Sequence, residues 1–79
     1  MLFRVGDRVR TLATESRTEE SNKVYANRTG VITEISYPGG TVVCYKVKFD
    51  KPFYDCGYPI EWHYYYDHQN SLEKMVRME

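Results

Sequence analysis

The sequence predicts an all-β protein in which five short strands curl into a small barrel. Val, Ile, Thr and the aromatic residues account for 29 of the 79 residues, and these side chains favour strands over helices. Several short segments alternate polar and apolar residues, as half-buried strands do. The length fits one domain, 1–79. A flat sheet of this size would leave its apolar face wet and its edges open, so we expect it to fold over on itself.

The first strand is expected within residues 2–12, where Val9 and Thr11 fall on one face. The polar stretch 13–27 that follows is the long first loop of the predicted barrel. A helix, a hairpin-like excursion and a mobile loop all remain open for this stretch. Ser16-Arg17-Thr18-Glu19 favours the helix locally, because it matches a capping box.

A tight turn at 27–30 leads into a second strand over 31–35. The next turn, Tyr37-Pro38-Gly39-Gly40, fits a type II turn, because Pro presets φ at the first central position and Gly accepts positive φ at the second. The third strand is predicted over 41–49. Alternation places its side chains on two faces, Val43, Tyr45, Val47 and Phe49 on one and Cys44, Lys46 and Lys48 on the other.

A loop is predicted over 50–59 and a fourth strand over 60–66. Alternation divides the side chains of this strand between two faces. We expect an inward set and an outward set, namely Ile60, Trp62, Tyr64 and Tyr66 inward, and Glu61, His63 and Tyr65 outward. Residues 67–70 are predicted to form one short helical or 3₁₀ turn, and residues 71–78 the last strand.

Three segments carry a resemblance to a known fold family: Val5-Gly6-Asp7-Arg8-Val9-Arg10, Arg28-Thr29-Gly30-Val31-Ile32-Thr33-Glu34-Ile35 and Tyr45-Lys46-Val47-Lys48-Phe49-Asp50. Together with the aromatic strand and the Leu-containing end, Trp62 to Leu72, they resemble the SH3-like small barrels of the KOW type. Such barrels are found in small single-domain bacterial and phage proteins. The resemblance covers most of the chain except 13–27 and 50–59. It implies a five-stranded SH3-like barrel and an association with nucleic acid or ribosomes.

The aromatic residues predict a surface for a partner. Nine of the twelve lie between Tyr45 and Tyr66, which is more than a small core and a solvated loop require. Tyr suits interfaces, because it offers a large contact area, few rotatable bonds and a polar tip. We therefore expect a non-enzymatic module that binds a protein partner, with a phage-encoded modulator of a host protein as one hypothesis. The predicted partner-binding residues are Tyr54, Tyr58, His63 and Tyr65.

Two other functions stay open. One is binding of RNA or DNA, with Arg8, Arg10, Arg28, Lys46 and Lys48 on phosphates and Tyr65 stacked on a base. The other is a small nucleotide-like ligand held between subunits. Eleven Lys and Arg balance eleven Asp and Glu, which argues against binding driven mainly by bulk positive charge. A homo-oligomer also stays open, because small barrels leave edge strands that can pair.

Metal binding, cofactors and catalysis are not expected. Four side chains could ligate zinc, namely Cys44, Cys56, His63 and His68, but the two cysteines lack the close spacing that structural zinc sites use. The sequence contains no Gly-x-Ser-x-Gly, no phosphate-binding Gly-rich loop and no His-Glu-x-x-His motif.

The expected location is the cytoplasm. Arg4, Asp7, Arg8 and Arg10 stand where a signal peptide would need an apolar stretch. The longest apolar run, Val42–Tyr45, is far too short to cross a membrane. Two cysteines do not make the disulfide framework of a small secreted domain, so both are predicted to be reduced thiols.

Overall fold

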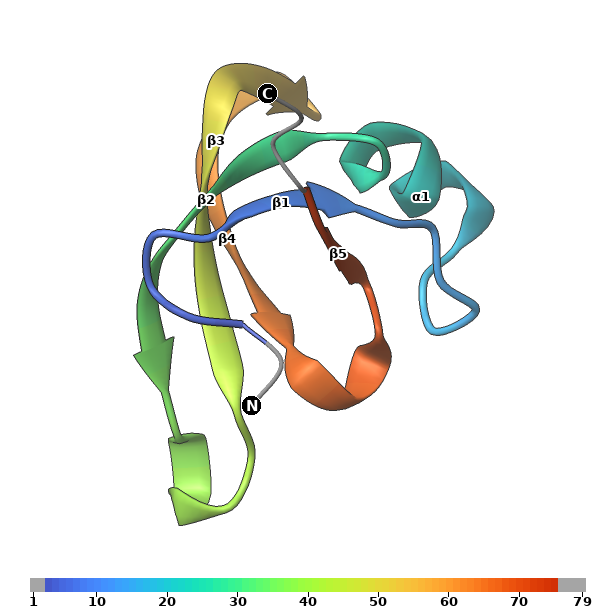
Figure 1. The fold of residues 1–79 in the computed structure, drawn as a ribbon. Helices are drawn as coiled ribbons and strands as arrows, with labels where there is room; N and C mark the ends of the chain where they lie inside the picture. The colour runs from blue at the N-terminus through green and yellow to red at the C-terminus, as the bar shows by residue number, and fades with distance from the viewer. Residues whose placement is uncertain (1–2, 76–79) are drawn as a thin grey trace.

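The computed structural model describes residues 3–75, and within them it contains five strands, one α-helix and two 3₁₀ turns (Figure 1). In chain order these are β1 (Arg8–Thr11), α1 (Glu19–Tyr25), β2 (Thr29–Ser36), η1 (Pro38–Gly40), β3 (Cys44–Asp55), β4 (Tyr58–Tyr66), η2 (Asp67–Gln69) and β5 (Leu72–Lys74). The strands pair antiparallel in one sheet of order β4-β3-β2-β1-β5. The predicted all-β class is confirmed for these residues. The sheet is not closed, because β4 and β5 stand at its two ends.

The core lies on the inner face of this curled sheet, where β1 runs across the direction of β3 and β4 (Figure 1). Its buried side chains are Phe3, Val9, Ile32, Tyr45, Val47, Phe49, Phe53 and Tyr65. Aromatic rings meet edge to face there, as in the pairs Phe3–Tyr45 and Phe49–Phe53. Few aliphatic residues are available in the chain, so ring packing supplies much of the buried apolar area.

The second half of the long first loop forms the helix α1. Thr18, rather than Ser16, is its N-cap, since the Ser21 backbone N–H donates to Thr18 Oγ1 at 3.1 Å. On the side facing the preceding loop, the Asn22 side chain accepts from the Thr14 N–H at 3.1 Å and donates to the Thr14 carbonyl at 2.9 Å. Asn27 follows the helix with a positive φ of 60°. The helix is therefore held by its cap and by its tie to Thr14.

The turn between β2 and β3 matches its prediction. Gly39 has φ 72° and ψ 4°, which are type II values. The Gly40 N–H donates to the Tyr37 carbonyl at 2.8 Å, which closes the turn. The short turn before the last strand is present as η2, and Asn70 ends it in the left-handed region.

The predicted loop over 50–59 is wrong, because β3 continues to Asp55 and β4 already begins at Tyr58. The two strands meet through Cys56 and Gly57, both at positive φ, as a two-residue hairpin turn of type I′ requires. Pro52 lies within β3, although proline lacks the N–H that an interior strand position donates. It falls between Lys48 and Phe53, where the register of the β3–β4 pairing shifts, so its missing N–H breaks no regular ladder.

The predicted facing of the fourth strand is also wrong. Tyr65 pairs with the buried Tyr45 and is itself only 1% exposed, whereas Trp62, Tyr64 and Tyr66 point outward. Ile60 does point inward, packed against the core. The alternation therefore breaks between Ile60 and Trp62, opposite the register shift in β3. An unbroken alternation that starts with Ile60 inward therefore assigns every residue from Trp62 onward to the wrong face.

The last strand is shorter than predicted, Leu72–Lys74 rather than 71–78, and the predicted residues 76–78 lie outside the described part. Gly30 marks a close approach of β2 to β3, because a Cβ there would collide with the Lys48 carbonyl oxygen. Within residues 3–75, no helix combines the length and apolar character needed to span a bilayer.

Candidate partner-binding surface

Three outward aromatic side chains form what we call the aromatic ridge, composed of Trp62, Tyr64 and Tyr66 of β4. They alternate along the strand and are 46%, 41% and 39% exposed. The rings of Trp62 and Tyr64 meet edge to face at 5.2 Å, and Tyr66 stacks on His68 at 5.6 Å. The ridge is therefore a row of supported rings rather than a set of isolated side chains.

The neighbouring strand sets lysines beside the ridge. Lys48 pairs with Trp62 across β3 and β4, and Lys46 pairs with Tyr64. The Lys46 ammonium lies 4.4 Å from the centre of the Trp62 ring, within cation–π range. This contact orients the indole and gives the β3 side of the ridge a positive edge.

A hollow of about 220 Å³ adjoins the ridge on the side of η1. It is lined by Ser36, Pro38 and Cys44 together with Tyr64 and Tyr66. Cys44 is a free thiol, and burial raises its pKa above the usual value, so it acts here as a small apolar side chain. The hollow can take an apolar side chain of a partner.

A larger groove, of about 570 Å³, lies on the other side of the ridge, between β4 and residues 16–25. His63 lines it together with Tyr64 and Tyr66. Because side chains from both faces of β4 take part, the groove follows the edge of that strand.

The polar groups inside this groove are coupled. The Tyr25 hydroxyl donates to Asp55 Oδ2 at 2.6 Å, and burial, followed by this carboxylate, raises the pKa of Tyr25 to about 12. Arg17 lies over the ring of Tyr25 at 5.1 Å and over that of Tyr65 at 5.3 Å. Burial, and then the charge of Arg17, lower the pKa of His63, which favours its neutral form.

The four predicted partner-binding residues are not one surface. Tyr54 and Tyr58 are 70% and 73% exposed and lie beside the hairpin turn. This is the start of β4, whereas Tyr66 is at its other end. His63 is half-buried, with its ring 4.9 Å from that of Tyr25. Tyr65 is in the core, so its expected place on the surface is wrong. The alternation of residues does group Trp62, Tyr64 and Tyr66 on one face, but the prediction placed that face inward, whereas these side chains are exposed.

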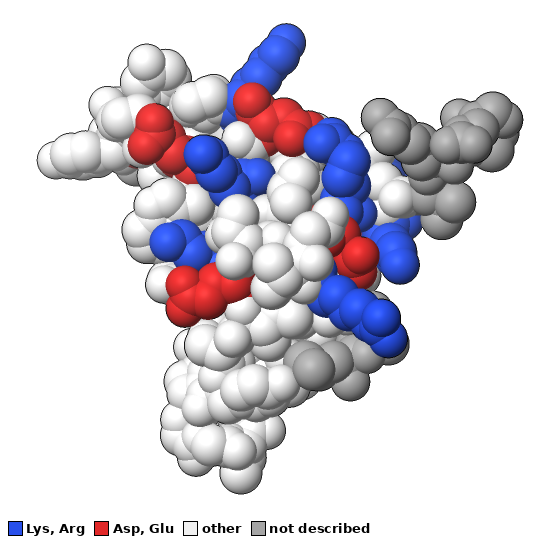
Figure 2. Space-filling model, turned by 60° about the vertical axis from the view of Figure 1, so that its left-hand side comes forward, with Lys and Arg blue, Asp and Glu red and all other residues white. Residues whose placement is uncertain are grey.

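The five predicted phosphate-binding residues do not form a free positive stripe. Arg8 Nη2 lies 2.5 Å from Asp50 Oδ2, and Arg10 binds Glu73 at 2.8 Å. Arg28 turns away toward the core and lies 4.1 Å above the Phe53 ring. On the face shown in Figure 2, basic and acidic side chains are intermingled.

The four candidate zinc ligands do not gather. Cys44 is buried beside the ridge, and Cys56 is exposed at the hairpin turn. Across residues 3–75 there is no group of three or more His, Cys, Asp or Glu side chains placed to share a metal ion.

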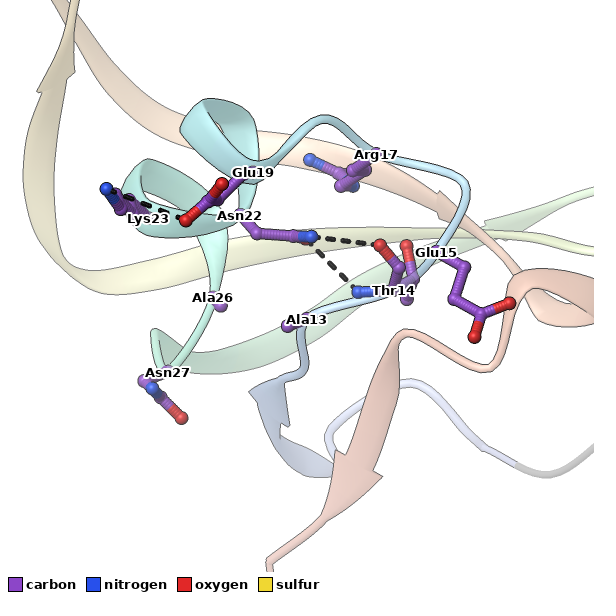
Figure 3. A pocket seen from close by; sticks show the side chains of 9 residues that line it. All are labelled: Ala13, Thr14, Glu15, Arg17, Glu19, Asn22, Lys23, Ala26 and Asn27. Carbon is purple, nitrogen blue, oxygen red and sulfur yellow. Dashed lines mark hydrogen bonds and ion pairs between the residues drawn. The ribbon is translucent and has the colours of Figure 1, made fainter.

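A third hollow, of about 720 Å³, lies between residues 13–17 and α1. Figure 3 shows Asn22 reaching across it to Thr14, while Glu15 points away from the helix. Glu19 and Lys23 pair with each other along α1 at 4.0 Å. The side-chain amide of Asn22 therefore ties the loop to the helix. We assign this hollow a structural role rather than a ligand-binding one.

Comparison of the chain with protein-family models, with curated proteins and with solved structures finds no match.

Proposed function

We propose that this protein is a non-enzymatic binding module that recognises a protein partner through the aromatic ridge. The observation that carries the proposal is the exposure of Trp62, Tyr64 and Tyr66 on one face of an edge strand. Trp and Tyr are the residue types that most often supply interface binding energy. The adjoining hollow offers a socket for an apolar anchor, and the lysines beside the ridge offer a polar rim.

The charge distribution favours a protein over a nucleic acid. Arg8 and Arg10 already have carboxylate partners, so phosphates would have to compete with Asp50 and Glu73. Lys46 and Lys48 remain beside the ridge, and two cations supply little of the counterion release on which nucleic-acid affinity depends. Rings beside lysines can also stack on bases, and RNA or DNA binding is therefore the alternative that the test below includes.

The proposed fold is an SH3-like barrel of the KOW type. The element order supports this proposal: a long excursion between β1 and β2, hairpins joining β2, β3 and β4, and a 3₁₀ turn before β5. The pairing of β1 with both β2 and β5 is a further supporting feature. The aromatic ridge lies on the outer face of this proposed barrel, where it does not contribute to the core.

The test is the affinity of the full chain for short peptides selected on it from a random displayed library. Tyr64→Ser should weaken the binding of these peptides by about 2 kcal/mol, roughly thirtyfold in Kd, because the variant loses a hot-spot ring. The matched control is Tyr54→Ser, which removes an exposed tyrosine far from the ridge and should leave Kd unchanged. Equal effects of the two changes would contradict the proposal.

Fluorescence anisotropy of a labelled oligo-uridine and a labelled oligo-thymidine probe, titrated with the full chain, tests the alternative. We expect no saturable binding of either probe. Binding that falls steeply as salt rises from roughly 50 to 200 mM, and that Tyr64→Ser abolishes, would favour nucleic acid over protein as the ligand of the ridge.

A further inference from the structure

The edge of β4 that faces the groove is open. In the strand order β4-β3-β2-β1-β5, β4 pairs only with β3. Among the described residues, no other strand takes up its second row of backbone groups. Such an edge is a template for an added strand. Pro59 lacks an N–H, which confines the usable edge to the part of β4 that follows it.

Arg17 stands across the groove from this edge with its charge unmatched. It is half-buried, and its guanidinium lies over the rings of Tyr25 and Tyr65. No carboxylate of residues 3–75 comes within ion-pair distance of it. Asp55 lines the same groove but accepts the Tyr25 hydroxyl instead. A guanidinium held in place in this way is prepared to receive a carboxylate, which it can bind with two parallel hydrogen bonds.

We propose that an extended acidic segment of a protein partner adds to the open edge of β4 and sets one carboxylate against Arg17. This inference rests on the function proposed above and specifies the chemistry of the partner. Residues 63–66 line the groove through three side chains and span roughly 13 Å at about 3.3 Å per residue. A short strand of the partner therefore suffices to reach from one end of this stretch to the other.

The surroundings of Arg17 select a single negative charge over a phosphate backbone. Asp55 lies in the groove, and α1 opens with Glu19 and Glu20 in its first turn. A polyanion would meet these carboxylates, whereas one side-chain carboxylate needs only the guanidinium. Apolar side chains of the same segment would contact Tyr64 and Tyr66, which border the groove and belong to the ridge.

The test uses the selected peptides on the full chain in a double-mutant cycle. We expect the peptides to share an Asp or Glu. Changing that residue to Asn or Gln should weaken binding to the wild type roughly tenfold. Arg17→Gln should weaken the binding of the acidic peptide by a similar factor. In that variant the change of the peptide's acidic residue should no longer alter Kd, because the two groups act as a pair.

Two controls keep the result specific. Arg4→Gln removes the same guanidinium charge from an exposed position that lines neither the groove nor the hollow beside the ridge, and should change Kd less than twofold. Arg17→Lys keeps the charge without the planar fork, so it should recover part of the affinity that Arg17→Gln loses even if packing on Tyr25 is altered. Additive effects of the peptide and Arg17 changes would overturn the inference.

The outcomes separate this inference from the proposed function. Peptides that depend on Tyr64 but share no acidic residue, or that ignore Arg17, would overturn the acidic-segment inference and leave the ridge proposal standing. Peptides that ignore Tyr64, or the absence of any selected binder, would overturn both. Sedimentation velocity can also detect a homodimer that a selected peptide dissociates. Such a dimer would place a second copy of the chain on the edge of β4, and this result would overturn the inference.

Discussion

Removing the hydroxyl of Tyr65 tests the position of this residue in the core. Its side chain is 1% exposed, and its hydroxyl has no hydrogen-bond partner among the described residues. A buried hydroxyl without a partner costs about 1–3 kcal/mol. Tyr65→Phe keeps the ring and its contact with Arg17 and deletes only the unsatisfied group. We expect the free energy of unfolding to rise by about 1 kcal/mol, which is roughly 4–8 °C in Tm for a domain of this size.

The matched control is Tyr45→Phe. Tyr45 is equally buried, but its hydroxyl donates to Asp67 Oδ1 at 2.9 Å. Losing a hydrogen bond to a carboxylate should lower the free energy of unfolding by about 1.5–3 kcal/mol. Both variants delete one tyrosine hydroxyl, but only the Tyr45 hydroxyl has a hydrogen-bond partner to lose. They should therefore move the urea midpoint in opposite directions, with little change in the dependence of the unfolding free energy on urea concentration.

Urea unfolding followed by circular dichroism and by the fluorescence of Trp62 measures both changes. A loss of stability in Tyr65→Phe as large as that in Tyr45→Phe would refute the reasoning, because it would mean that the Tyr65 hydroxyl has a partner in solution. Burial raises the pKa of Tyr65, so its phenol stays neutral and the comparison holds across the neutral pH range.

Three further predictions concern the fold. Gly30→Ala should lower the free energy of unfolding by about 1–3 kcal/mol in urea, because its Cβ would collide with the backbone of β3; an unchanged midpoint would contradict this. The hydrogen bonds of Arg8 hold the pKa of Asp50 below its usual value. Their stabilisation is therefore present above the ordinary Asp pKa of about 4 and lost as pH falls through the lowered folded value, and Asp50→Asn should flatten that acid part of the stability profile. Thr18→Ala removes the helix cap at a cost of about 1 kcal/mol, so hydrogen exchange should speed up in α1 and not in β3, and uniform protection would contradict it.

Local pattern predicted much of this fold. Strand-favouring residues and alternation indicated the β class, and the strand around Ile32 and the type II turn at Gly39 follow from their own neighbours in sequence. The β3–β4 hairpin, which has Pro52 inside β3, does not follow from neighbours in sequence. A proline is tolerated there because the β3–β4 register shifts around it, and that shift depends on both strands.

The outward aromatic side chains of the candidate surface were predicted as a group, but on the wrong face of the strand. Alternation grouped Trp62 with Tyr64 and Tyr66 correctly, but periodicity alone cannot say which group faces the core. The break after Ile60 decided it, and that break arises from pairing with β3. Arg17 was not singled out, because its contacts with the rings of Tyr25 and Tyr65 join segments far apart in the chain.

The most direct test of the ridge as the binding surface is the fluorescence of Trp62, which is the single tryptophan of the chain. In the free protein, 46% of this residue is exposed, so its emission should be red-shifted and accessible to acrylamide. Saturation with a selected peptide should shift the emission to the blue and protect it from quenching, in Tyr54→Ser as in the wild type. Unchanged emission and unchanged quenching in a fully bound complex would contradict the assignment of the ridge as the partner-binding surface.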